Sequence, residues 1–165
     1  MERSMVPAVL SGSGVSSGPD ETHEIGRQIG VIAAPGTVLA LIGPLGAGKT
    51  QLTKGIAAGL GVTEVVNSPT FILMNEHVGR LRLYHVDAYR LGGAEEAWGA
   101  GILDERQVDG VTVVEWADLL EGWLPLERLE IHLVAPASAP MRRELHWTAI
   151  GSAHERLAAA AFGAQ

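Results

Sequence analysis

The stretch Val38-Leu39-Ala40-Leu41-Ile42-Gly43-Pro44-Leu45-Gly46-Ala47-Gly48-Lys49-Thr50 decides the fold of this chain. Its first five residues form a continuous apolar run, which predicts a strand buried on both faces. The remaining eight follow the spacing Gly, four residues, Gly, Lys, Thr of a phosphate-binding loop (P-loop), which requires a strand before it and a helix after it. Behind the loop, Leu52, Ile56 and Leu60 mark one face of a helix, so the sequence predicts the whole order strand, loop, helix.

The glycines of such a loop let main-chain N–H groups converge on phosphate oxygens, and the N-terminus of the next helix adds partial positive charge. We expect the Lys49 ammonium to contact the β- and γ-phosphates and the Thr50 hydroxyl to bind Mg²⁺. An ordinary glycine-rich turn between strand and helix is the alternative interpretation. The residues expected to contact the nucleotide are Gly43, Leu45, Gly46, Ala47, Gly48, Lys49, Thr50 and Gln51.

Two acids end predicted strands and are candidates for catalysis together with Lys49. Glu115 follows the buried strand 111–114, where P-loop proteins place an acid that holds magnesium, so we expect Thr50 and Glu115 to be the metal ligands. Asp87 ends the strand 81–87 and is expected to polarise the attacking water or to hold a magnesium-bound water. The alternatives are a solvated glutamate at a strand end and an aspartate that caps a turn.

Three other features near these acids are open to two interpretations. The loop Ser68-Pro69-Thr70 either senses the γ-phosphate or is a proline turn. His85 is interpreted as a packed, hydrogen-bonded residue without a catalytic role. Trp116 either covers the site or belongs to the core.

The predicted fold is a three-layer α/β P-loop NTPase with a mixed, mainly parallel central sheet and antiparallel hairpins. Residues 1–20, rich in Gly and Ser, are expected to be a flexible tail, and residues 21–165 the ATPase domain. Further elements are expected as follows: a helix capped by Thr22 that carries Ile25, Ile29 and Ile32; antiparallel strands at 71–74 and 81–87; a helix over 94–103; an antiparallel edge pair at 129–134 and 145–150; and an Ala-rich helix ending near Ala161.

The charge and composition exclude several classes of function. The net charge of -7 is the wrong sign for a surface that neutralises nucleic-acid phosphates directly. The chain has no cysteine, which excludes thiol catalysis and disulfides and fits the cytoplasm. We find no signal-peptide pattern and no apolar run long enough to span a bilayer, so no membrane association is expected.

Four motifs in order resemble the TsaE (YjeE) family: Leu45-Gly46-Ala47-Gly48-Lys49-Thr50, Ser68-Pro69-Thr70-Phe71, His85-Val86-Asp87-Ala88-Tyr89-Arg90-Leu91 and Val114-Glu115-Trp116. The resemblance covers about residues 20–125. It implies a weak ATPase that binds Mg-ATP and joins the TsaD and TsaB proteins, which form threonylcarbamoyladenosine in tRNAs reading ANN codons. In the family TsaD carries out the acyl transfer, so the resemblance implies that this chain contacts tRNA only indirectly, through its partners.

The resemblance also implies roles for single residues. Lys49 and Thr50 bind Mg-ATP, Glu115 helps to hold magnesium, Asp87 supports hydrolysis, and Thr22 approaches the nucleotide. The chain departs from the family at Pro44, where an acid is usual, and at Ala117, where proline is frequent. These departures concern the rigidity of the loop more than phosphate binding, because the groups that face phosphate are the backbone and Lys49.

Two other functions use the same loop. A small-molecule kinase usually needs an arginine-bearing lid, and only Arg106 lies between Arg90 and Glu115. A nucleotide-binding adaptor without hydrolysis would be stabilised by ATP through mass action alone. Turnover measured with and without partners separates the adaptor from the ATPase.

Overall fold

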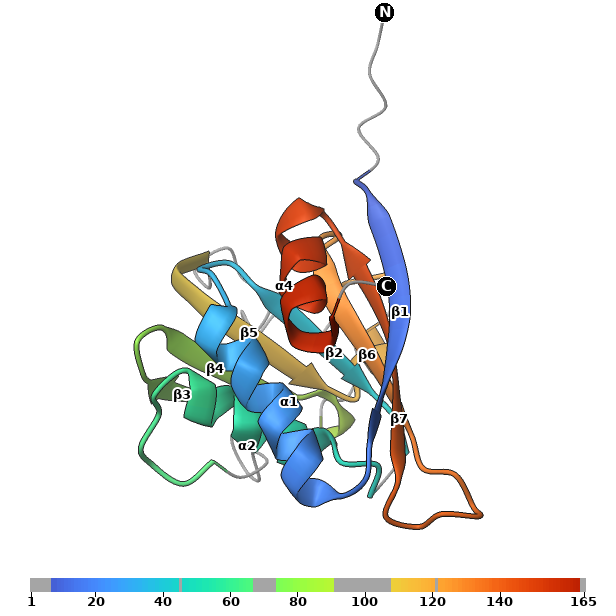
Figure 1. Cartoon of the computed structure of the whole chain (residues 1–165). Helices are drawn as coiled ribbons and strands as arrows, with labels where there is room; N and C mark the ends of the chain where they lie inside the picture. Colours follow the sequence, from blue (N-terminus) through green and yellow to red (C-terminus); the bar gives the residue numbers. More distant parts are fainter. Residues whose placement is uncertain (1–6, 45, 67–73, 91–107, 121, 164–165) are drawn as a thin grey trace, which may run out of the picture.

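The computed structural model describes residues 7–44, 46–66, 74–90, 108–120 and 122–163. Within these ranges the chain forms one seven-stranded sheet, three α-helices and two short 3₁₀ helices (Figure 1). The elements are β1 (Val9–Ser16), α1 (Pro19–Ile32), β2 (Val38–Ile42), α2 (Lys49–Gly59), β3 (Met74–Val78), β4 (Arg82–Asp87), η1 (Ala88–Arg90), β5 (Gly110–Glu115), η3 (Ala117–Leu120), β6 (Arg128–Val134), β7 (Arg143–Ile150) and α4 (Ser152–Phe162).

The strand order is β1-β7-β6-β2-β5-β4-β3. Parallel pairing is confined to the centre, where β2 lies between β6 and β5 and β5 pairs with β4. The three remaining pairs are antiparallel, so a mixed sheet is confirmed but a mainly parallel one is wrong. The hairpins β3–β4 and β6–β7 match the expected antiparallel pairs, because their connections are too short for a parallel crossover. The difference comes from β1, which adds a third antiparallel pair at the edge of the sheet.

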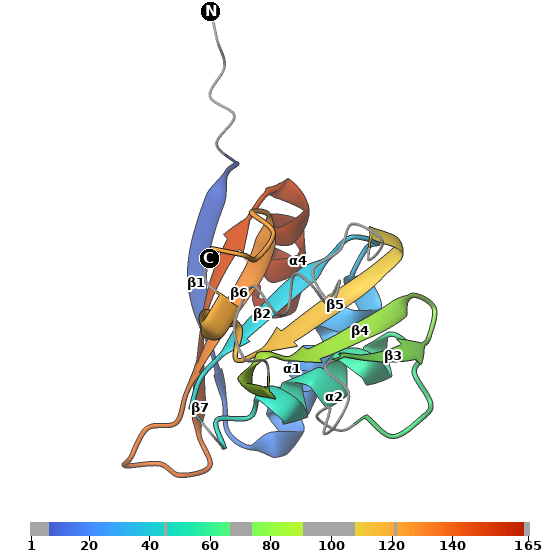
Figure 2. The ribbon, with the colours of Figure 1, turned by 180° about the vertical axis from the view of Figure 1, so that it is seen from behind.

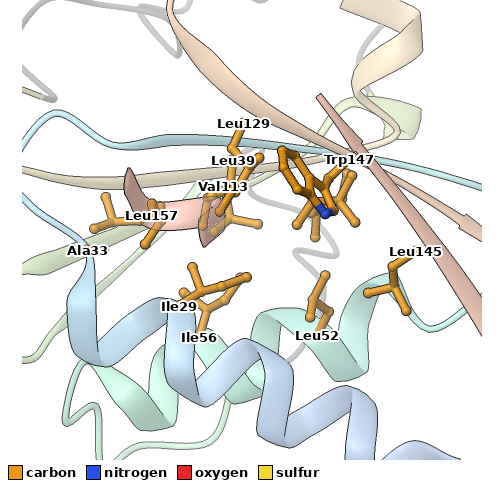
Figure 3. Packing of buried hydrophobic residues seen from close by; sticks show 14 of the residues in the cluster. Ile29, Ala33, Leu39, Leu52, Ile56, Val113, Leu129, Leu145, Trp147 and Leu157 are labelled. Atoms are coloured by element: carbon orange, nitrogen blue, oxygen red, sulfur yellow. The ribbon is translucent and has the colours of Figure 1, made fainter. Parts of the chain in front are cut away.

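The helices α1, α2 and α4 lie on one face of the sheet, in front of it in Figure 1 and behind it in Figure 2. In Figure 3, Ile29 of α1 and Ile56 of α2 face Leu39 and Val113 of the sheet. The alternate β2 residue Ala40 packs on the other face with Ala117 and Leu120 of η3. The predicted burial of β2 on both faces is thus confirmed. The expected helix over 94–103 lies outside the described residues, so a third helical layer stays a prediction.

The prediction of a flexible tail is wrong for Val9–Ser16, which form the edge strand β1 paired with β7. The sequence predicts that the strand at 145–150 lies at the edge of the sheet. This prediction is wrong, because β1 pairs with β7 and takes the edge position. The glycines of this segment, which made it look disordered, are needed because large side chains pack directly against the strand. A Cβ at Gly12 would lie 2.4 Å from the Trp147 indole, and a Cβ at Gly14 would lie 2.9 Å from the Phe162 ring.

Other boundaries also shift. The first helix begins at Pro19, and Thr22 is not its cap but a buried residue of its first turn. Its hydroxyl hydrogen bonds with the Ser16 hydroxyl at 2.7 Å. The hairpin expected around Gly79 is present as β3 and β4, but β3 extends to Val78 and does not end at Met74 as the sequence predicts. The Ala-rich helix is present as α4. Across the described ranges, none of the helices has the length and apolarity that spanning a membrane requires.

Glycines bring the backbones of α1 and α2 into direct contact. A Cβ at Gly26 or Gly30 of α1 would lie 2.3 or 2.1 Å from a carbonyl oxygen of α2. A Cβ at Gly55 or Gly59 of α2 would lie 2.1 Å from a carbonyl oxygen of α1. Both pairs have a spacing of four residues, which places their members on one helix face. The glycines that weaken each helix in isolation are therefore what lets the two helices pack.

We expect Gly30→Ala to lower the free energy of unfolding by about 2 kcal/mol, because the new methyl overlaps the Ile56 carbonyl. Elsewhere in a helix the same change stabilises by about 0.5–1 kcal/mol. Urea unfolding measures the difference. Gly18→Ala is the control, since no atom lies within 4 Å of its Cβ position. An unchanged or raised stability for Gly30→Ala would contradict the contact.

Candidate functional site

The loop after β2 is held in a glycine-specific conformation. Gly46 and Gly48 have φ of 82° and 106°, in the left-handed region that other residues rarely adopt. A Cβ at Gly43 would lie 2.7 Å from the Leu133 carbonyl oxygen, so the loop passes close to the end of β6. Ala47 N donates to Pro44 O at 3.1 Å across the loop, and Leu52 N donates to Gly48 O at 2.9 Å as α2 begins. This is the tight turn into a helix that the spacing predicted.

Lys49 lies inside this loop. Its side chain is buried, and Nζ donates to the carbonyl oxygens of Gly43 and Pro44, the latter at 2.9 Å. Nζ also lies 4.0 Å from the centroid of the Trp116 ring, a cation–π contact. Burial lowers the pKa of Lys49, and the nearby carboxylates of Glu115, Asp118 and Asp87 oppose this shift. The ammonium therefore stands at the loop with acids close by.

Glu115 joins the loop to the neighbouring strands. The Thr50 hydroxyl donates to Oε1 at 3.0 Å, and the Thr53 hydroxyl lies 3.5 Å from Oε2. His85 Nε2 hydrogen bonds with Oε2, and both side chains are buried. The prediction that His85 is a packed, hydrogen-bonded residue is confirmed. Because partners from β4 and α2 hold it, Glu115 is a fixed carboxylate beside the start of α2.

Asp87 lies next to Glu115 because the two are paired in register across the parallel strands β4 and β5. It is 6% exposed, and its Oδ1 accepts a hydrogen bond from Tyr89 N at 3.0 Å. The turn-capping interpretation is thus present in the structure. The expected role of Asp87 in hydrolysis stays a prediction.

Trp116 has an unusual backbone. Its φ of 60° is the one positive value among the non-glycine residues that the structure describes. A bulky residue in this region is strained, and such strain gathers at functional sites. The ring lies 5.0 Å from that of Tyr89 and is partly buried. It packs against the core cluster around Ala40 and also lies over the Lys49 ammonium, so features of both interpretations are present.

The remaining predicted residues fall into two groups. Thr22 lies beside the loop, since a Cβ at Gly48 would be 3.7 Å from Thr22 Cγ2. The Gln51 side chain instead donates to Pro19 O of α1 at 3.4 Å, and its expected contact with the nucleotide stays a prediction. Leu45 and the segment 68–70 lie outside the described residues, so their expected roles stay predictions.

Sequence reasoning missed two residues that contact the site. Thr53 is buried one turn into α2 and reaches Glu115. Arg143 of β7 donates to carbonyl oxygens of the loop itself, at Gly46 and Ala47. The position of Thr53, four residues after Lys49, could have indicated its helix face. Nothing local marks Arg143, because its partners lie more than ninety residues away.

Comparison with known proteins places these residues in one family. The family model described as Threonylcarbamoyl adenosine biosynthesis protein TsaE matches residues 16–145. The tRNA threonylcarbamoyladenosine biosynthesis protein TsaE of Bacillus subtilis is 48% identical over 141 residues, 84% of this chain and 86% of that protein. The protein of the same name from Treponema pallidum is 40% identical over 119 residues, 72% of this chain and 88% of that protein.

The fold has a solved counterpart. The crystal structure of Bacillus subtilis YdiB superposes with a TM-score of 0.74 at 40% sequence identity and covers 91% of this chain and 93% of that one. The stretch matched by the family model contains each of the site residues discussed above, from Thr22 to Arg143.

The geometry around Glu115 generates a stability prediction. We expect Glu115→Ala to leave the chain folded but to lower the free energy of unfolding by about 2 kcal/mol, because buried His85 loses its partner. Glu115→Gln keeps the shape of the side chain and should lower the free energy of unfolding by a smaller amount. Urea unfolding is the measurement, and Asp118→Ala removes an exposed acid near Lys49 as the control. Equal stability of the Ala variant and the unaltered chain would contradict the buried network.

Proposed function

Because this chain belongs to the TsaE family of threonylcarbamoyladenosine biosynthesis proteins, we propose that it is a magnesium-dependent ATPase with a P-loop NTPase fold. The observation that supports this most is the meeting of Lys49, Thr50 and Glu115 at the carboxyl ends of β2 and β5. A loop that merely turned from strand to helix would need no buried ammonium beside a buried carboxylate.

In the proposed ATP complex, the main-chain N–H groups of the loop and the N-terminus of α2 bind the phosphates. Lys49 is already held in the loop by two carbonyl oxygens, so little side-chain entropy is lost when its ammonium turns to phosphate oxygens. The Trp116 ring lies 4.0 Å from the ammonium, and an apolar neighbour of this kind strengthens the field of the charge at the phosphates.

The residues present also fit magnesium. The Thr50 hydroxyl and a Glu115 oxygen are 3.0 Å apart, and hydroxyl and carboxylate oxygens are the ligands that this ion prefers. When bound, magnesium supplies positive charge against the triphosphate. His85 fixes the Glu115 carboxylate in place, so its orientation does not have to be acquired during binding. We assign to Asp87, beside it, the polarisation of the attacking water.

We further propose that the chain acts in the cytoplasm with TsaD and TsaB proteins in forming threonylcarbamoyladenosine in tRNAs reading ANN codons. The net charge of -7 supports contact with tRNA through these partners rather than directly. In this arrangement ATP hydrolysis drives a conformational cycle of the complex, and the acyl transfer belongs to TsaD.

We expect Lys49→Ala to reduce magnesium-dependent ATP turnover by at least about 100-fold, because it removes the ammonium that stabilises charge on the transferred phosphoryl group. Phosphate release from ATP, without any acceptor molecule, is the measurement. Lys54→Ala on the same helix is the matched control and should be unaffected. Turnover in Lys49→Ala equal to that of the unaltered chain would refute the assignment of hydrolysis to this loop. ADP formation that required an added acceptor and released no phosphate would identify a kinase.

The partner proposal has its own test. Purified TsaD and TsaB proteins, immobilised together, are expected to retain this chain more strongly with ATP than with ADP, because the γ-phosphate changes the loops at the site. The fraction retained is quantified by gel. Absence of retention with either nucleotide would contradict the partner assignment while leaving the ATPase proposal intact.

A further inference from the structure

Arg143, at the start of β7, binds the back of the phosphate loop. Its Nε donates to Ala47 O at 3.0 Å and its Nη2 donates to Gly46 O at 3.1 Å. The remaining nitrogen, Nη1, donates to Pro140 O at 2.7 Å and to Arg142 O at 2.8 Å. One guanidinium thus joins two consecutive carbonyls of the loop to two carbonyls of the β6–β7 connection.

The geometry of the peptide bond gives these contacts a consequence. Each peptide unit is planar and trans, so its N–H points away from its C=O. The carbonyls of Gly46 and Ala47 point to Arg143, and the N–H groups of Ala47 and Gly48 therefore point to the opposite side. In this structure Ala47 N donates across the loop to Pro44 O, a hydrogen bond that a bound phosphate would replace.

The loop needs such a restraint because of its composition. Gly46 and Gly48 flank these two peptide units, and glycine leaves the backbone free to rotate. An arginine presents its donors in a rigid planar fork, which fixes two neighbouring carbonyls at once. A lysine would carry the same charge without the fork.

We propose that Arg143 is a positioning residue for nucleotide binding, which orients the Ala47 and Gly48 amides toward the phosphates from behind the loop. This inference rests on the proposed function, since it concerns how the same loop binds ATP. Arg143 itself stays on the outer side of the loop and contacts no phosphate. Its contacts with Pro140 and Arg142 tie the orientation of the amides to the conformation of the β6–β7 connection.

The test compares the unaltered chain with Arg143→Ala, Arg143→Lys and the neighbouring control Arg142→Ala, which changes an exposed arginine. Mg-ATP and ADP affinities are measured by calorimetry, and kcat and KM by phosphate release. For Arg143→Ala we expect about tenfold weaker binding of both nucleotides. This is about the change in affinity expected when one hydrogen bond to a charged group is lost. We expect kcat at saturating ATP to change much less, because the groups that act on the γ-phosphate remain.

The lysine variant separates orientation from charge and also serves if the alanine variant fails to fold. Weak nucleotide binding by Arg143→Lys, together with normal binding by Arg142→Ala, would support a role for the planar guanidinium of Arg143. Full affinity in Arg143→Lys would overturn the inference, because charge alone would then suffice. Equal affinity of Arg143→Ala and the unaltered chain would overturn it while leaving the ATPase intact. If the unaltered chain bound no ATP, the proposed function would fail and this inference with it.

Discussion

The parallel pairing of β2 with β5 on one side and β6 on the other is the constraint on which the rest of the molecule depends. A strand with parallel neighbours on both sides has no hairpin available at its end. The chain must therefore leave the sheet through a loop and a helix, which here are the glycine loop and α2. Because parallel strands also end at one edge of the sheet, Glu115 and Asp87 arrive beside that same loop.

Contact between the backbones of α1 and α2 transmits this arrangement to the N-terminal part of the chain. α2 begins inside the glycine-rich loop, and the glycines of both helices allow α1 to lie against it. The start of α1 consequently lies near the loop, with Thr22 beside Gly48. Since β1 directly precedes α1, the same contact brings β1 to the sheet edge, where it pairs with β7. Small residues thus serve close packing in both places.

The site concentrates charge where a protein interior normally excludes it. Lys49, Glu115 and His85 are all buried, and hydrogen bonds compensate the two charged side chains: loop carbonyls for the lysine, and Thr50 and His85 for the glutamate. Such compensation makes burial tolerable without making it strongly stabilising. Together with the positive φ of Trp116, this is an arrangement that folding alone would not favour, and it supports a functional reason for the cluster.

The sequence by itself determined the local parts of this protein. The glycine-rich turn from strand to helix, the strand buried on both faces, the β3–β4 hairpin and the acid that ends β5 follow from spacing and periodicity over a few residues. What only the tertiary structure decided depends on partners distant in the chain. β1 was read as a tail because its small residues lack apolar surface, whereas the deciding partners, Trp147 and Phe162, are more than 130 residues away. Arg143 was missed for the same reason. Any residue type has a backbone carbonyl, so the sequence around Ala47 does not indicate that an arginine binds there.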